Sequence, residues 1–566
     1  MTVHIDTLPR HRLILLAAVM VGFGLILTWQ LVRWQVIERD RFIDILNNRP
    51  TGETQTPPRR GRVLDRDGHP LAVDTVEYQI TATPQWIEDA AEVARRLAPL
   101  LELTEEELVT QLSSDASWVM LRHHAPREVG ETLRDWDIPG VHITPWPRRG
   151  YPEGTLAAHL LGFVAEDQIG FYGIEGFYNQ LLAPHLHPAE EGEGSIAAAA
   201  FATSLSDLAA SGSPDLILTI DRLIQHIAEE ELDAAIGQHG ASGGTVIVME
   251  PRTGAILAMA SRPVYDPEHY SETPTAQVWA NPAISSIYEP GSVFKIVTLA
   301  AALDNASVTL DRVFKDTGII EVGGQTIYNS DRLPHGRVTI TDAMTLSLNT
   351  VLAQLSTEMG AKAFYAYVQR FGFGHSTGID LSGESEGQLK LATDAEWHES
   401  DLGTNAFGQG LAVTPLQMAT AVAAIANRGT MMTPYVVAEI QGADQSWPRH
   451  PTVARQVVSP QTAQRVTAIL IQAAERGASK SVVPGYTIAG KSGTAQIPIP
   501  GGYDPRWTIA SFVGYAPAYD PQFLILVKID RPTDTPWGSA VAAPAFRNIA
   551  QRLFVLMNIP PDRELN

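Results

Sequence analysis

The chain is 566 residues long, more than a single compact core usually holds, so several structural units are expected. Its net charge of −22 argues against a nucleic-acid-binding protein, because phosphate recognition needs clustered cations that this sequence lacks. Cysteine is absent, which excludes disulfide bonds and thiolate catalysis.

An apolar segment near the N-terminus predicts a membrane anchor. The run LILLAAVMVGFGLILTWQLV carries no charge and is long enough to cross a bilayer as a helix. We expect a cytoplasmic tail over residues 1–12, a single transmembrane helix over residues 13–33 and the bulk of the chain outside the cytoplasm. A cleaved signal peptide is the alternative, although the run is longer than a usual signal core and no A-x-A site follows it.

Residues 34–215 are expected to form a mixed α/β domain. A turn at residues 65–68 separates two β-rich runs, which is typical of a hairpin. Residues 87–137 have helical spacing, with Thr104 and Glu107 placed as a capping box. The loop-like, Ala- and Ser-rich segment that ends this region marks a domain boundary.

The remainder, residues 216–566, has the pattern of an α+β domain. The run LILTID predicts a strand, and RLIQHIAEEELDAAI predicts an amphipathic helix after it. Two β-rich runs meet at a turn over residues 251–254, FVGYAPA and FLILVKID predict two more strands, and a final helix is expected from about Ala543. This order predicts an antiparallel sheet covered by helices, with a helical insert.

Lysine is scarce in this sequence: only seven of the 41 basic residues are Lys, and none precedes residue 295. Arg is permanently cationic, whereas a buried Lys can become a neutral base. Ser292 and Lys295 form an S-x-x-K at the expected start of a helix, where residues three apart share one face. The serine could be a nucleophile and the lysine its base. A capping serine beside a solvent-facing lysine would have the same spacing.

A second polar pair, Ser347 and Asn349, begins another apolar helix. Its hydroxyl and amide could relay a proton and bind a peptide carbonyl. Taken alone, the pair is more typical of a helix cap.

The third motif is Lys491-Ser492-Gly493-Thr494, within a predicted strand. Lys491 supplies a second cation that could lower the pKa of Lys295. The hydroxyls of Ser492 and Thr494 could bind a carboxylate, and Gly493 would let a substrate or another backbone approach closely. In isolation the tetrapeptide would more often be a polar turn.

The order S-x-x-K, S-x-N, K-S-G-T is similar to a triplet found in penicillin-binding proteins and class A β-lactamases. The surrounding sequence resembles class B penicillin-binding proteins, which are monofunctional D,D-transpeptidases. In the first domain the similar segments are RRGRVLDRDGHPLA (59–72), RGYPEGTLAAHLLGFV (149–164) and GFYGIEG (170–176). In the second they are YEPGSVFK, FGFGHSTGIDLSGE, FGQGLAVTPLQMA, AGKSGTAQ, ASFVGYAPA and VAAPAF.

The resemblance implies an elongated pedestal domain followed by a transpeptidase domain, and it assigns roles to the motifs. Ser292 would be the acylated nucleophile, with Lys295 as its general base. Ser347 and Asn349 would assist proton transfer and hold the donor peptide. Lys491 would tune the electrostatics, while Ser492, Gly493 and Thr494 would bind the substrate, its terminal carboxylate meeting the two hydroxyls. The backbone amides of Ser292 and Thr494 would form the oxyanion hole. No metal or cofactor is implied.

The implied reaction is cross-linking of peptidoglycan stem peptides, derived from lipid II, through an ester on Ser292. β-Lactams would be inhibitors, and a SEDS-family glycosyltransferase would be the membrane partner. YEPGS, FGQGLAVTPLQ and VAAPAF look closer to the septal branch of the family, with the elongation branch as the alternative. A penicillin sensor, a serine β-lactamase or a non-catalytic scaffold of the wall-building complex are the remaining alternatives.

Overall fold

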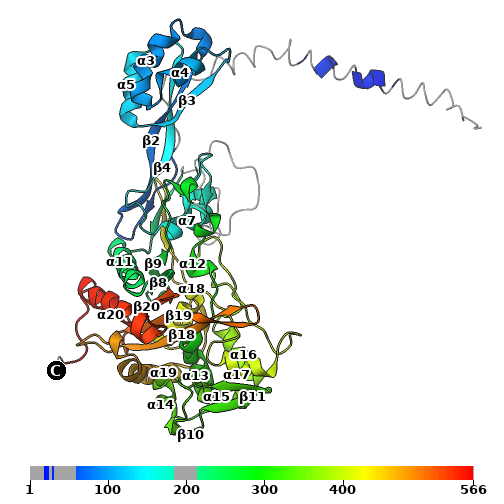
Figure 1. The fold of residues 1–566 in the computed structure, drawn as a ribbon, viewed down its shortest axis with the longest axis vertical. Helices are drawn as coiled ribbons and strands as arrows, with labels where there is room; N and C mark the ends of the chain where they lie inside the picture. Colours follow the sequence, from blue (N-terminus) through cyan, green and yellow to red (C-terminus); the bar gives the residue numbers. More distant parts are fainter. Residues whose placement is uncertain are drawn as a thin grey trace, which may run out of the picture. The chain divides into compact units, whose positions relative to one another are not determined.

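The computed structural model describes residues 59–183, 213–273 and 275–564, together with a few positions between residues 18 and 33 (Figure 1). The chain divides into two compact units, residues 1–57 and residues 58–566, and the second contains the sheets and the candidate site. The tail and transmembrane helix expected over residues 1–33 lie largely outside the described residues. Among the residues that are described, no helix has both the length and the apolar character needed to cross a bilayer.

Three helices pack on antiparallel strands in the N-terminal part of the second unit. The strands are β2 (Pro70–Ala82), β3 (Val119–Ala125) and β4 (Val141–Gly150), and the helices are α3 (Ala90–Leu101), α4 (Glu105–Leu112) and α5 (Arg127–Trp136). The predicted capping box of Thr104 and Glu107 is confirmed. The prediction that residues 87–137 are helical is wrong at β3, because this segment pairs with β2 and buries Leu121 and Ala125 in the core.

The hairpin predicted around residues 65–68 is confirmed, and it joins β1 (Val63–Leu64) to β2. The Asp65 carboxylate accepts hydrogen bonds from the N–H of Asp67 (2.9 Å) and of His69 (2.8 Å), which fixes the turn. β1 also pairs in parallel with β7 (Asp215–Leu218). The sheet continues through β15 (Val437–Gln441) to β16 (Ser446–Pro448), so strands from both sides of the boundary predicted near residue 215 share one sheet.

A buried ionic network joins three distant segments of the N-terminal part. Arg60 Nε donates to Glu175 Oε2 at 2.7 Å, and Arg149 Nε donates to Glu175 Oε1 at 2.7 Å. Arg149 also donates to Asp74 at 2.9 Å. Burial alone would raise the pKa of the Glu175 carboxyl, but the two guanidinium groups hold it below its usual value. The network therefore fastens together the three segments that resemble pedestal motifs.

The larger part of the unit is built on a five-stranded antiparallel sheet, as predicted. Its order is β18 (Ala489–Ile499), β19 (Gly502–Ala516), β20 (Phe523–Asp530), β8 (Gly243–Met249) and β9 (Ile256–Arg262). Helices α11 (Arg222–His239) and α20 (Gly538–Leu556) cover one face. Helix α20 begins at Gly538, five residues before the predicted start near Ala543. The helix contains Pro544 in its interior, although proline usually lies in the first turn of a helix. The start predicted from the sequence is therefore too late.

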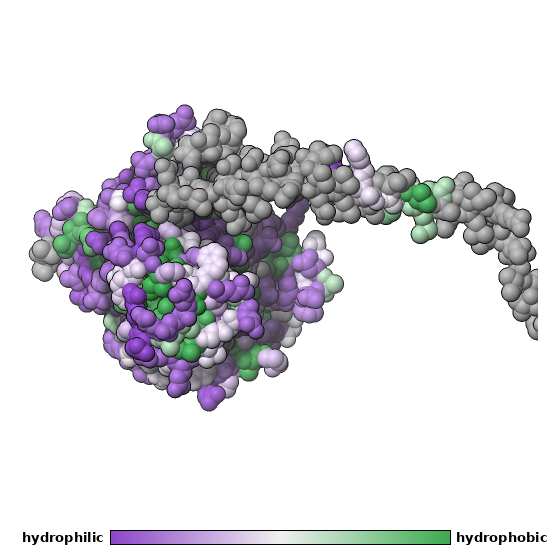
Figure 2. Space-filling model, turned by 90° about the horizontal axis from the view of Figure 1, so that it is seen from above, coloured by the Kyte–Doolittle hydropathy of each residue, from purple (hydrophilic) through white to green (hydrophobic). Residues whose placement is uncertain are grey.

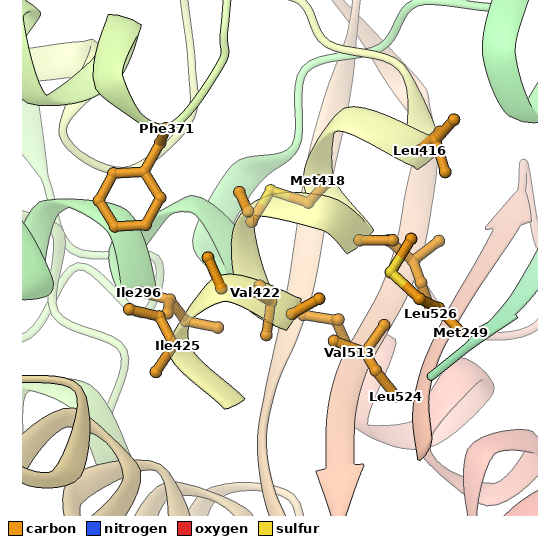
Figure 3. Packing of buried hydrophobic residues seen from close by; sticks show 14 of the residues in the cluster. Met249, Ile296, Phe371, Leu416, Met418, Val422, Ile425, Val513, Leu524 and Leu526 are labelled. Atoms are coloured by element: carbon orange, nitrogen blue, oxygen red, sulfur yellow. The ribbon is translucent and has the colours of Figure 1, made fainter. Parts of the chain in front are cut away.

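The opposite face of the sheet packs on three helices, the first of which begins with Lys295. These are α13 (Lys295–Asp304), α18 (Pro415–Ala426) and α19 (Pro460–Gln472). In Figure 3, Met418, Val422 and Ile425 of α18 lie between Ile296 of α13 and the sheet residues Val513, Leu524 and Leu526. Every residue of α18 is buried, so this helix forms the centre of the core.

The predicted helical insert is confirmed, and it also contains two small antiparallel sheets. Its helices are α14 (Ile340–Thr345), α15 (Asn349–Met359), α16 (Ala361–Arg370) and α17 (Glu399–Asn405). Strand β10 (Val313–Asp316) pairs with β13 (Gly336–Thr339), and β11 (Ile319–Val322) pairs with β12 (Gln325–Tyr328). The remaining helices and strands are α6 (Ala158–Leu161), β5 (Phe163–Val164), β6 (Gly170–Phe171), α7 (Gly173–Phe177), α8 (Asn179–Leu182), α12 (Pro282–Ser285), β14 (Thr430–Met432) and β17 (Val453–Gln456).

The molecular surface is largely polar on the face drawn in Figure 2, where apolar residues form small, separate groups. This agrees with the excess of 63 acidic over 41 basic residues in the sequence.

Candidate active site

The three sequence motifs meet in one cleft between the five-stranded sheet and the helical insert. The cavity has a volume of about 590 Å³ and is open to solvent. The structure places six of the eight predicted site residues directly on its wall: Ser292, Ser347, Asn349, Lys491, Ser492 and Thr494. Lys295 and Gly493 lie behind that wall, where both are buried.

Ser292 lies on a short 3₁₀ turn, η5 (Gly291–Phe294), and Lys295 is the first residue of α13. In a 3₁₀ turn, residues three apart are aligned along the helix axis, so the turn directs both side chains to one side. Gly291 has φ +57°, and a side chain there would meet the carbonyl oxygen of Thr494 at 2.9 Å. Its N–H donates to the carbonyl oxygen of Gly408 at 3.0 Å. The serine turn is therefore clamped between β18 and the FGQG segment.

Lys295 is fully buried in a largely apolar helix, and its amine contacts the second motif. Nζ donates to the Ser347 carbonyl oxygen at 2.6 Å and to Asn349 Oδ1 at 2.8 Å, and it lies 3.1 Å from Ser347 Oγ. Burial, and then the charge of Lys491, hold the pKa of Lys295 well below its usual value. Two carbonyl acceptors use the two hydrogens of a neutral amine, which leaves its lone pair for a hydroxyl.

Lys491 is the second buried lysine of the cleft. Burial lowers its pKa to about 8, and Nζ donates to the carbonyl oxygen of Ser492 at 3.0 Å. Among the described residues, no carboxylate lies within 4.0 Å of either amine. The two lysines thus lie in one cleft without acidic partners. This favours the neutral form of Lys295, whose pKa is held well below its usual value.

The S-x-N motif is held by residues that sequence reasoning missed. Ser347 has φ +58°, an uncommon conformation for a non-glycine residue, and Asn349 begins α15. Asn349 Nδ2 donates to the Tyr328 carbonyl oxygen at 2.9 Å, and its backbone N–H donates to Asn329 Oδ1 at 3.0 Å. Asn329 Nδ2 in turn donates to Asp316 at 2.9 Å. These hydrogen bonds therefore fix the orientation of the Asn349 side chain, whose amide oxygen accepts from Lys295.

The K-S-G-T motif lies on β18, at the edge of the sheet and beside η5. Ser492 and Thr494 are two residues apart, so they point to the same side of the strand. A side chain at Gly493 would meet Val293 at 3.0 Å and the Pro290 carbonyl oxygen at 3.1 Å. Glycine at this position therefore allows the serine turn to pack closely against β18. Thr494 Oγ1 accepts a hydrogen bond from the N–H of Gly538 at 3.0 Å, which fixes this hydroxyl at the start of α20.

A buried carboxyl, also missed from the sequence, lies three residues before Ser292. Glu289 Oε1 accepts hydrogen bonds from Gly410 N at 2.9 Å and from the Tyr503 hydroxyl at 3.3 Å. Burial raises the pKa of Glu289 to about 7. Its other oxygen is buried and has no hydrogen-bond partner among the described residues. Glu289 thus connects the serine turn to the FGQG segment and to β19.

The comparisons with known families match both halves of the chain. The model of the "Penicillin binding protein transpeptidase domain" matches residues 244–551, and that of the "Penicillin-binding Protein dimerisation domain" matches residues 55–185. The second match covers the part with the buried ionic network, and the first covers the cleft.

Similar proteins extend over nearly the whole chain. Stage V sporulation protein D of Bacillus subtilis is 33% identical over 89% of this chain and 79% of its own length. Peptidoglycan D,D-transpeptidase FtsI of Escherichia coli is 29% identical over 94% of this chain and 89% of its own length. The crystal structure of penicillin-binding protein 3 from Mycobacterium tuberculosis with aztreonam is similar, with a TM-score of 0.68 and 27% identity over 90% of this chain and 98% of that one.

Proposed function

This chain belongs to the class B penicillin-binding proteins, and on that premise we propose that it is a serine D,D-transpeptidase that cross-links peptidoglycan stem peptides. The observation that carries the proposal is the position of Lys295. It is a buried amine without an acidic partner, hydrogen-bonded to Ser347 and Asn349, one turn from a serine on the wall of an open cleft. A scaffold protein would have no need for such an amine.

The first half-reaction acylates Ser292. Its Oγ attacks the carbonyl carbon between the two terminal D-alanines of a stem pentapeptide, and neutral Lys295 takes the hydroxyl proton. The tetrahedral oxyanion is held by the backbone N–H groups of Ser292 and Thr494, where a single donor contributes roughly 3 kcal/mol to lowering the barrier. Lys295 then passes this proton to the leaving nitrogen as the C–N bond breaks, so D-alanine leaves with a neutral amine, Lys295 is neutral again, and an ester remains on Ser292.

The second half-reaction transfers the acyl group. The amine of a neighbouring stem peptide attacks the ester, and Lys295 takes a proton from the attacking nitrogen. It returns this proton to Ser292 Oγ as the ester bond breaks, and a new amide forms. During acylation the hydroxyls of Ser492 and Thr494 bind the terminal carboxylate of the donor, next to the cation of Lys491, and this carboxylate leaves with the D-alanine. Gly493 keeps this strand close to the serine turn.

β-Lactams are proposed inhibitors of the same site, because they resemble the D-Ala–D-Ala terminus and acylate the same serine. This is supported by the structures of similar proteins determined with aztreonam and with ampicillin. The expected test is labelling with a fluorescent penicillin. Wild-type protein should become covalently labelled and Ser292→Ala should not, whereas label retained by the variant would refute the assignment.

Catalytic turnover separates the proposed transpeptidase from its alternatives. Purified protein mixed with lipid-linked stem pentapeptides should form cross-linked dimers and release D-alanine. Rapid hydrolysis of penicillin instead would indicate a β-lactamase, and stable acylation without dimers would indicate a sensor. Absence of both reactions would indicate a non-catalytic scaffold.

The setting of the reaction is also a proposal. Residues 13–33 anchor the chain in the plasma membrane as one helix, with residues 1–12 in the cytoplasm and the pedestal (34–215) and transpeptidase domain (216–566) outside. A SEDS-family glycosyltransferase supplies the glycan strands. The likeness of YEPGS, FGQGLAVTPLQ and VAAPAF to the septal branch supports a role in division. Depletion should then give filaments, and round cells would support the elongation branch instead.

A further inference from the structure

One arginine on the wall of the cleft has no role in the chemistry described above. Arg332 lies on the loop between β12 and β13, and its exposed side chain lines the same cavity as Ser292 and Asn349. The side chains of Lys295 and Lys491 are buried, whereas the guanidinium of Arg332 is exposed in the cleft, where a substrate can contact it directly.

The loop that carries Arg332 is held in place by the network behind the S-x-N motif. The backbone N–H of Arg332 donates a hydrogen bond to the carbonyl oxygen of Asn329 at 3.0 Å. The side-chain amide of Asn329 donates to the carbonyl oxygen of Leu333 at 3.3 Å. The same Asn329 side chain accepts the N–H of Asn349 at 3.0 Å. Arg332 is thus tied through one residue to the asparagine that contacts Lys295.

The backbone at Arg332 adopts an unusual conformation. Its φ is +58°, which lies in the left-handed region where arginine is uncommon, and Ser347 on the same cavity wall has φ +58° as well. Conformations of this kind persist when surrounding contacts impose them, and they concentrate at functional sites. Here they direct the side chain onto the wall of the cleft.

The guanidinium is oriented but has no acidic partner. It lies over the ring of Tyr328, 5.5 Å from the ring centre, and the Tyr328 carbonyl oxygen accepts from Asn349. The nearby Asp331 instead pairs with His335 at 2.8 Å. Within the described part of the chain no carboxylate lies within 4.0 Å of Arg332. In a chain with net charge −22, an arginine without an acidic partner in a cleft indicates an anionic ligand.

We propose that Arg332 is a binding residue for the acceptor peptide, and that it takes a free carboxylate beside the acceptor amine. The inference rests on the proposed transpeptidase function. The donor carboxylate is assigned to the hydroxyls of Ser492 and Thr494 on β18 during acylation, whereas Arg332 belongs to the insert that carries the S-x-N motif. A diamino acid with a free carboxylate next to its amine, as in diaminopimelate, fits this chemistry, and a side chain with only an amine does not.

The test compares two acceptors and two half-reactions. Acylation is measured with fluorescent penicillin, and transfer is measured with a stem tripeptide ending in diaminopimelate or with the same peptide carrying an amide in place of the carboxylate beside the amine. Arg332→Gln should lower kcat/KM for the carboxylate acceptor by roughly 10- to 100-fold, the range of a charge-assisted contact. The amide acceptor and the acylation rate should change by less than about twofold on the same grounds.

Matched variants keep the result interpretable. Arg337→Gln removes an exposed arginine of the neighbouring strand β13, outside the cavity wall, and should leave both acceptors unchanged. Equal loss with both acceptors would make Arg332 a structural residue, slower acylation would place it on the donor side, and no loss would remove it from the site. Each of these overturns the proposal. Failure of wild-type protein to react with penicillin would instead overturn the proposed function.

Discussion

At the scale of single residues, the site depends on where two lysines are placed. A helix that is buried all round begins with Lys295, so the charged form of its amine is destabilised by desolvation before any neighbour is counted. Lys491 adds a like charge from the adjacent strand. Arg at either position would remain protonated, which explains why a chain rich in arginine uses lysine here.

The pH dependence of acylation should report this arrangement. The reactive form has neutral Lys295, so the rate rises with pH through the lowered pKa of Lys295 and falls in acid as the amine gains its proton. Removing the like charge in Lys491→Ala should raise the pKa of Lys295 and move the acid limb of the profile to higher pH. Exposed Lys480 provides the control, because Lys480→Ala should leave the midpoint in place. An acid limb that stays put or moves down in Lys491→Ala would contradict the coupling.

The two lysines, the serine and the S-x-N pair could be singled out from the sequence as candidates, because each motif is short and lysine is rare. Asp316, Asn329 and Glu289 could not. They are polar residues whose partners lie far away in the chain, so no spacing marks them. Only the fold shows that Asn329 meets Asn349, 20 residues later, and that Glu289 meets Gly410 and Tyr503.

At the scale of elements, the sequence predicts those segments whose pattern is local. The hairpin of β8 and β9, helix α11 and the capping box of α4 are confirmed, because alternation, helical spacing and capping residues are all visible in a short window. Strand β3 is wrongly predicted, since its pairing with β2 is a tertiary contact that overrides the helical surroundings.

The buried network of the N-terminal part makes a prediction at this scale. Glu175→Gln keeps the shape of the side chain but removes the charge that compensates Arg60 and Arg149, and breaking a buried ion pair costs about 3–5 kcal/mol. The melting temperature should therefore fall, while penicillin acylation of the folded protein should persist. Because the pKa of Glu175 is lowered, its stabilising contribution is complete above its unfolded-state pKa and is lost as the pH falls through the folded-state value.

A surface pair gives the matched control for this variant. Glu131 pairs with Arg127 at 2.8 Å on the exposed side of α5. Glu131→Gln should change the melting temperature little, because exposed pairs are screened by water. Equal melting temperatures for the two variants would mean that the network does not stabilise the fold.

At the scale of the whole molecule, the fold joins regions that the sequence separates. The two domains were predicted with a boundary near residue 215, yet β1 pairs with β7, and β15 from the second half extends the same sheet. A continuous sheet couples the N-terminal part to the catalytic part mechanically, because a strand shared by two regions cannot move with one of them alone. Sequence periodicity identifies such strands but not their partners.

The membrane topology is the prediction that belongs to this scale, and the composition makes it easy to test. The chain has no cysteine, so a single introduced cysteine is the only thiol that a maleimide can label. Asp67 lies in an exposed turn of the part proposed to be outside, and Thr7 lies in the proposed cytoplasmic tail. A membrane-impermeant maleimide should label Asp67→Cys in intact spheroplasts, but Thr7→Cys only after the membrane is opened. Labelling of Thr7→Cys in sealed spheroplasts would show that the topology is the reverse of the proposed one. The catalytic cleft would then lie in the cytoplasm, away from the peptidoglycan that it is proposed to cross-link.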